Sequence, residues 1–202
     1  MHFEQQKSLR TTLRSLLSPI ASELGLYISA FEFGSDHRGP IVRIFLDSSN
    51  GVTISQCTRF SKEISPVMDV EDPITSAYVL EISSPGVDRL LELPEDFERF
   101  KGFHITVKTQ ARRKKRHGIL GESDQEGFFL ILENKSSEET DQDPVNQDPT
   151  DQKRTDQKRT DQKRTDTKRI NFNDVVFARL NPTEEEFSLL AQQRSPSKKP
   201  NT

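Results

Sequence analysis

The segment from Asn134 to Arg169 most constrains how this 202-residue chain can fold. It contains one aliphatic residue, Val145, and ends in three Thr-Asp-Gln-Lys-Arg units followed by the variant unit 165–169. Apolar burial cannot offset the entropy of ordering such a segment, and a five-residue period leaves no apolar face on a helix with about 3.6 residues per turn. We therefore predict that residues 134–169 are disordered, form a solvated spacer and are dispensable for folding.

Residues 1–92 predict an α/β domain. Apolar residues from Leu9 to Leu24 recur at helical spacing, which predicts an amphipathic helix over about residues 4–24, bent or restarted at Pro19. A second helix should begin at Thr53, where Gln56 completes a capping box. Three segments have strand patterns: Leu26–Phe33, Ile41–Leu46 and Ala77–Ser83. The order helix, two strands, helix, strand predicts a sandwich with helices on one face of the sheet.

Residues 93–181 predict a small β-barrel of SH3 or Sm type, which makes the whole chain α+β. A short helical linker, Pro94–Phe100, comes first. Five short strand patterns follow, and the disordered segment separates the third from the fourth: Phe103–Val107, His117–Leu120, Phe128–Leu132, Ile170–Phe172 and Val175–Leu180. Lengthening a hairpin loop costs only slowly growing entropy. Residues 182–202 should form a short helix, Thr183–Gln192, and a polar tail.

The charge pattern excludes a protein that binds nucleic acid through bulk positive charge. The chain has 29 Lys and Arg against 32 Asp and Glu, a net charge of -3, and residues 1–92 hold eight basic against twelve acidic residues. Any RNA contact must be local. Five consecutive cations on a predicted hairpin tip are candidates for contacting RNA phosphates, although a solvated loop is an equal alternative: Arg112, Arg113, Lys114, Lys115 and Arg116.

Other residue counts exclude several kinds of site. The single cysteine, Cys57, excludes a disulfide framework, a multi-thiolate zinc site and an iron–sulfur cluster, and it suits a reducing cytosol. The four histidines have no metal-ligand spacing, so we expect no cofactor or metal. The sequence has no long apolar run and no secretory signal, and we expect a cytoplasmic protein without membrane contact.

The serines Ser83 and Ser84 raise the question of catalysis. No strand–turn–helix nucleophile elbow surrounds them, so an enzyme that uses them is a remote alternative and we expect no enzymatic activity. Residues 84–87 instead match a type II turn, in which Pro85 supplies the fixed φ and Gly86 the positive φ. Beyond the turn, Arg89 is expected to pair with Asp88 or Glu81, or to face a partner.

The stretch from Ile41 to Leu91 resembles the bacterial ribosome maturation factor RimP family. The family hallmark Leu-Glu-Val-Ser-Ser-Pro-Gly-Leu-Asp-Arg-Pro-Leu corresponds to Leu-Glu-Ile-Ser-Ser-Pro-Gly-Val-Asp-Arg-Leu-Leu at Leu80–Leu91. Residues 53–57 and 69–74 also look like family positions. The resemblance covers about residues 5–133 and 168–181, and the repeat segment has no counterpart in the family.

This resemblance implies a two-domain factor, an α/β domain joined to an SH3-like domain, that binds the immature 30S ribosomal subunit and assists its maturation without catalysis. The five cations would then contact rRNA, and Pro85 and Gly86 would aim the residues that follow them. Another set would face a basic ribosomal protein: Asp69, Glu71, Asp72, Asp88 and Arg89. We expect a monomer without a small-molecule substrate.

The alternative function is an Sm-like RNA-binding regulator. Such a protein predicts oligomeric rings and affinity for free single-stranded RNA. The chain offers few aromatic candidates for base stacking, with no Trp and only two Tyr, Tyr27 and Tyr78, both in strand patterns.

Overall fold

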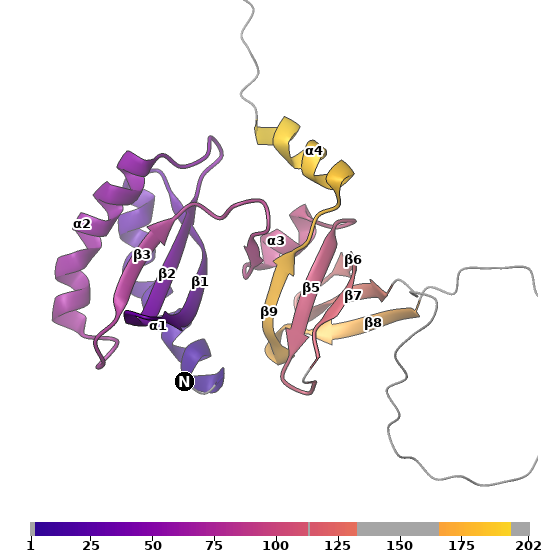
Figure 1. Ribbon diagram of the computed structural model, residues 1–202, viewed down its shortest axis with the longest axis horizontal. Coiled ribbons are helices and arrows are strands. Elements are labelled where there is room, and N and C mark those ends of the chain that lie inside the picture. The colour runs from indigo at the N-terminus through magenta and orange to yellow at the C-terminus, as the bar shows by residue number, and fades with distance from the viewer. Residues whose placement is uncertain (1–2, 113, 133–165, 195–202) are drawn as a thin grey trace, which may run out of the picture.

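The computed structural model describes residues 3–112, 114–132 and 166–194. These residues form a three-stranded sheet with two helices and, beside it, a six-stranded sheet (Figure 1). The predicted class, a mixture of helices and sheets, is confirmed. Arg113 and residues 134–165 of the repeat segment lie outside the described residues. No helix in the described ranges is both long and apolar enough to cross a membrane.

The first sheet follows the predicted order of helix, two strands, helix and strand. Strand β2 pairs antiparallel with β1 and parallel with β3, so β2 is central. Thr53 caps the second helix with the capping box expected from the sequence, and both helices continue through their internal prolines. The bounds are α1 (Phe3–Glu23), β1 (Tyr27–Asp36), β2 (Gly39–Asp47), α2 (Ile54–Glu71) and β3 (Val79–Ser83).

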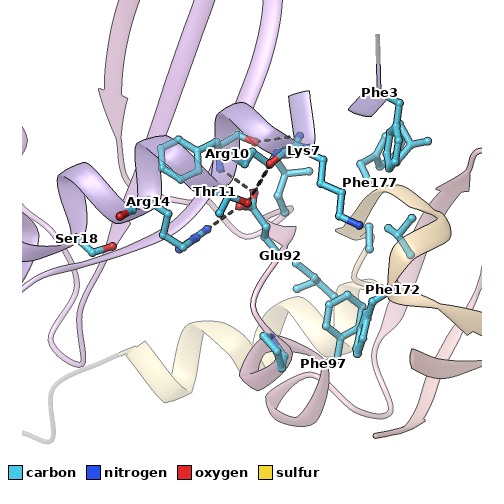
Figure 2. A pocket seen from close by; sticks show the side chains of 18 of the residues that line it. Phe3, Lys7, Arg10, Thr11, Arg14, Ser18, Glu92, Phe97, Phe172 and Phe177 are labelled. Carbon is cyan, nitrogen blue, oxygen red and sulfur yellow. Dashed lines mark hydrogen bonds and ion pairs between the residues drawn. The ribbon is translucent and has the colours of Figure 1, made fainter. Parts of the chain in front are cut away.

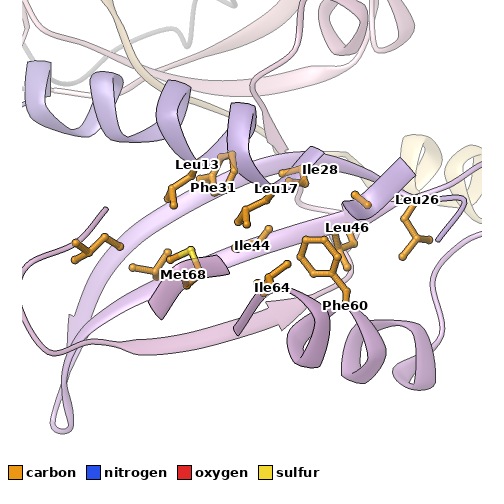
Figure 3. Packing of buried hydrophobic residues seen from close by; sticks show 13 residues of the cluster. Leu13, Leu17, Leu26, Ile28, Phe31, Ile44, Leu46, Phe60, Ile64 and Met68 are labelled. Carbon is orange, nitrogen blue, oxygen red and sulfur yellow. The ribbon is translucent and has the colours of Figure 1, made fainter. Parts of the chain in front are cut away.

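Both helices pack on one face of this sheet, as expected. Leu17 of α1 and Phe60 of α2 are fully buried in the same core as Phe31 and Ile44, which are register neighbours on β1 and β2 (Figure 3). The opposite face has a row of charged residues, because Arg43 lies in register between Glu32 and Glu81. Helices therefore cover one face of the first sheet, and the other face carries charged side chains.

The second sheet contains the five predicted strands and one more. Its order is β4-β9-β5-β6-β7-β8, and the described strands include no pairing of β4 with β8, so a closed barrel is not observed. A 3-10 turn, η1, precedes β9, and the final helix caps one end (Figure 1). The bounds are β4 (Leu90–Leu91), α3 (Pro94–Arg99), β5 (His104–Thr109), β6 (Arg116–Ser123), β7 (Gly127–Leu132), β8 (Asp166–Asn171), η1 (Phe172–Asp174), β9 (Val175–Leu180) and α4 (Glu184–Arg194).

Aromatic packing centres the second core on α3. The ring of Phe97 lies 4.7 Å from that of Phe128 and 4.8 Å from that of Phe172, measured between centroids. Leu91 of β4 is buried in the same core, although it follows directly on the segment that leaves the first sheet. The chain between β3 and α3 thus belongs to both halves of the molecule.

The predicted disorder of residues 166–169 is wrong. These residues form most of β8, which pairs antiparallel with β7 from Asp166 to Asn171. A strand at the edge of a sheet is held by backbone hydrogen bonds and needs little apolar side-chain area. Arg169 adds an ion pair, 2.8 Å from Asp124, and its guanidinium lies over the ring of Phe129. Low apolar content therefore did not prevent this last unit from being ordered.

Candidate functional site

The basic run lies where the sequence predicted, at the tip of the hairpin between β5 and β6. Arg112, Lys114 and Lys115 are exposed, and Arg116 is half-buried at the start of β6. Burial lowers the pKa of the Arg116 guanidinium, and the charge of Arg112 lowers it further. The fifth member, Arg113, lies outside the described residues. The tip thus presents a local concentration of positive charge, and such clusters of Lys and Arg bind the phosphates of nucleic acids.

Lys115 connects this hairpin to β9. Its ammonium nitrogen lies over the ring of Phe177, 5.3 Å from the centroid. Phe177 is half-buried and lies opposite Lys108 in the β5–β9 ladder. The positive charge of the tip is therefore next to an aromatic side chain of the neighbouring strand.

The acidic residues Asp69, Glu71 and Asp72 lie at the C-terminal end of α2, and all three are exposed. Asp72 ends the helix in the left-handed region at φ 38°, and its N–H donates to the carbonyl of Met68. Negative charge at this end of a helix opposes the helix dipole, and α2 has no basic residue in its last turn. Helix stability therefore does not account for these carboxylates, which leaves a partner-facing role open.

Asp88 and Arg89 point in opposite directions. Asp88 is exposed, and its carboxylate accepts a hydrogen bond from Arg179 at 3.2 Å. Arg89 is buried between the carboxylates of Asp47 and Asp96, and its guanidinium lies over the ring of Phe100. The expectation that Arg89 contacts a ribosomal protein is therefore wrong, because the side chain is inaccessible. The expected pairing of Arg89 with carboxylates is observed, but the carboxylates are those of Asp47 and Asp96.

The type II turn predicted at residues 84–87 is also wrong. Gly86 does not adopt a positive φ, and its N–H donates instead to the carbonyl of Ser84 across Pro85, at 3.2 Å. The physical reason is that the chain does not reverse here; it leaves β3 in one sheet and enters β4 in the other. Pro85 is buried at this crossing, and Gly86 allows close approach of the Asp88 carboxylate, 3.1 Å from where a Cβ would lie.

A groove of about 830 Å³ lies between α1 and β9 (Figure 2). One wall is the polar side of α1, the other is η1 and β9, and residues 90–92 form its floor. Figure 2 shows Phe3, Lys7 and Phe177 toward one end and Ser18 toward the other. The cavity therefore joins the two halves of the molecule.

Three cations of α1 line this groove, and Glu92 lies between two of them. Arg14 contacts the Glu92 carboxylate at 2.6 Å and Arg10 at 3.5 Å (Figure 2). The third cation, Lys7, donates to the side-chain oxygen of Asn173 at 2.8 Å. The sequence reading followed the leucine stripe and overlooked these cations, although positions 7, 10 and 14 have the spacing of one helix face.

Residues 16–88 match the family model of the RimP N-terminal domain. This part of the chain belongs to the RimP family. The match begins within α1 and ends at Asp88, just before β4. The family resemblance found in the sequence is confirmed over these residues.

The RimP N-terminal domain thus includes the acidic end of α2 and the serines that precede the crossing. The hydroxyl of Ser83 donates to the carbonyl of Ser84. In the described part of the chain, no group of three or more His, Cys, Asp or Glu side chains is placed to hold a metal ion. The basic hairpin lies beyond the matched residues, in the second sheet, so the predicted acidic and basic sites belong to different domains.

Proposed function

We propose that this protein is a ribosome maturation factor that binds the immature 30S subunit and assists its assembly without a chemical step. The observation that carries this proposal is the RimP N-terminal domain at residues 16–88. The exposed cations of the β5–β6 hairpin and the exposed carboxylates at the end of α2 support it, since a ribonucleoprotein surface offers both phosphates and basic protein.

In this proposal the two charged surfaces have separate roles. Arg112, Lys114 and Lys115 contact rRNA phosphates, while Asp69, Glu71 and Asp72 face a basic ribosomal protein. Binding favours a particular rRNA conformation only through a difference in affinity between the alternative conformations. The factor therefore acts by holding one local arrangement until later proteins join.

We further propose that the second sheet is SH3-like and that the protein is a cytoplasmic monomer. The order β9-β5-β6-β7-β8, with a 3-10 turn between β8 and β9, supports the SH3-like arrangement. Size-exclusion chromatography with and without RNA tests the monomer, because an Sm-like protein would elute as a ring.

Co-sedimentation of the purified protein with immature and mature 30S particles tests the proposal. We expect preferential binding to immature particles and weaker binding, with a shallower salt dependence, for Lys114→Gln and Lys115→Gln. Lys62→Gln, an exposed lysine on α2, removes the same charge elsewhere and should leave binding unchanged. In cells that lack the protein, we expect reduced 30S yield and unprocessed small-subunit rRNA. Normal yield and processing would refute the proposal.

A further inference from the structure

The groove between α1 and β9 has an excess of positive charge. Three cations line it against one carboxylate, Glu92. Arg10 and Arg14 are engaged with Glu92 and with backbone carbonyls, and their guanidinium groups lie over the rings of Phe33 and Phe31.

Lys7 differs from the two arginines. It is exposed, and its contact within the described residues is the neutral amide oxygen of Asn173. Its charge is thus available to an anionic ligand.

The same end of the groove is aromatic. Phe3, Phe172 and Phe177 line it from α1, η1 and β9, and all three are half-buried, so part of each ring is accessible (Figure 2). The volume of about 830 Å³ lies within the usual range for sites that hold small organic groups. A flat, partly apolar ligand with a negative charge matches this combination of rings and ammonium group.

The groove is also continuous with the basic hairpin. Lys115 lies over the ring of Phe177, and Phe177 lines the groove. A polyanion held by the hairpin cations would therefore lie close to the aromatic end of the groove. This continuity favours a nucleic acid over an acidic peptide, because bases and phosphates alternate along a single strand in the same way as the rings and cations do here.

We infer that the α1–β9 groove binds an unstacked nucleotide of single-stranded RNA, with the base against Phe3 and Phe177 and the adjoining phosphate at Lys7. The inference rests on the proposed function, since it specifies how rRNA is contacted. It requires an unpaired nucleotide, because a base within a duplex cannot leave its stack without unpairing.

Fluorescence anisotropy with a labelled single-stranded oligoribonucleotide tests this inference in the full chain. We expect Lys7→Gln to weaken binding and to reduce the slope of log affinity against log salt by about 0.7, the value for one phosphate contact on a single strand. Phe3→Leu and Phe177→Leu should weaken binding about 5-fold or more without changing that slope, because stacking is not a counterion effect. The matched controls are Lys62→Gln and Phe187→Leu, both at exposed positions away from the groove.

Three further arms separate the alternatives. A duplex of the same sequence should bind without sensitivity to Phe3→Leu, and a mononucleotide should bind much more weakly than the oligomer. If the groove variants bind the single strand like the unmodified protein, or if they lose affinity for an acidic aromatic peptide while their affinity for the RNA is unchanged, the inference is wrong. Co-sedimentation with immature 30S particles is a separate measurement that tests the proposed function. Binding of those particles by variants that bind the oligoribonucleotide normally would refute this inference and leave the proposed function intact, whereas failure to bind the particles would refute the proposed function.

Discussion

Nη1 of Arg89 lies 2.6 Å from Oδ2 of Asp47, with 1% and 8% of the two side chains exposed. Asp47 ends β2 in the first sheet, while the second partner of Arg89, Asp96 at 3.4 Å, lies in α3 beside the second sheet. Burial raises the pKa of the Asp96 carboxyl, and the charge of Arg89 and the backbone N–H groups of Leu93 and Glu92 act against this rise. One buried guanidinium thus links the two halves of the chain.

Replacing this guanidinium should be strongly destabilising. Arg89→Ala leaves two buried carboxylates without their cation, and we expect a loss of about 3–5 kcal/mol in the free energy of unfolding, measured by urea denaturation. Arg38→Ala removes an exposed arginine that pairs with Asp36 and Glu81, and it should cost far less, because ion pairs in contact with water contribute little to stability. Equal losses in the two variants would contradict the linking role.

Glu81 should titrate below its ordinary value of 4.5. Hydrogen bonds from Arg43 and then Arg38 lower the pKa of its carboxyl, at 2.6 and 2.7 Å. Because the folded-state pKa is depressed, the contribution of these ion pairs is present above the unfolded pKa and is lost as pH falls through the folded pKa. Carboxyl NMR titration should show Arg43→Gln moving Glu81 back toward 4.5, whereas Lys62→Gln should leave it in place.

Two glycines in strands should respond differently to alanine. A Cβ at Gly127 would lie 2.2 Å from the carbonyl oxygen of Ile170 on β8, so Gly127→Ala forces β7 and β8 apart and should cost about 1–3 kcal/mol. Gly34 on β1 has nothing within 4 Å of its Cβ position, and Gly34→Ala should stay within about 0.5 kcal/mol. Thermal unfolding of the two variants measures the difference. A tolerated Gly127→Ala would argue against the β7–β8 pairing.

The repeat segment should be removable without loss of stability. Leu132 and Asp166 are register neighbours, so its two ends emerge side by side. Replacing residues 134–164 with an Asn-Gly turn should leave the fold intact and, by loop-closure entropy, raise the free energy of unfolding by at most about 2 kcal/mol. Removing residues 166–171 as well should destabilise the protein, because β7 then keeps β6 but loses β8 on its other side. A stability loss from the shorter deletion would refute the spacer interpretation.

The periodic parts of the sequence predicted the secondary structure well. The leucine stripe of α1, the capping box at Thr53 and the five strand patterns of the second half all correspond to observed elements. These signals are local, since each depends on residues within one turn or one strand.

The errors involve contacts between distant parts of the chain. Sequence reasoning assigned Arg89 to nearby Asp88 or Glu81, whereas its partners lie 42 and 7 positions away. Pro85 and Gly86 predicted a reversal of the chain because Pro-Gly favours turns. At this point, however, the chain crosses from the first sheet to the second. The last repeat unit looked disordered by composition, yet an edge strand takes its stability from its neighbour's backbone. Composition and local pattern contain none of this information.

The buried link at Arg89 has a consequence for avidity. The acidic end of α2 and the basic hairpin belong to different domains, and both lie toward the lower edge of the molecule in Figure 1. If the ion pairs of Arg89 hold the two halves in one arrangement, the distance between these two charged surfaces is fixed, and a second contact gains its full effective concentration only where the target presents both sites at that spacing. Under the proposed function, the protein would discriminate between particles by distance as well as by chemistry.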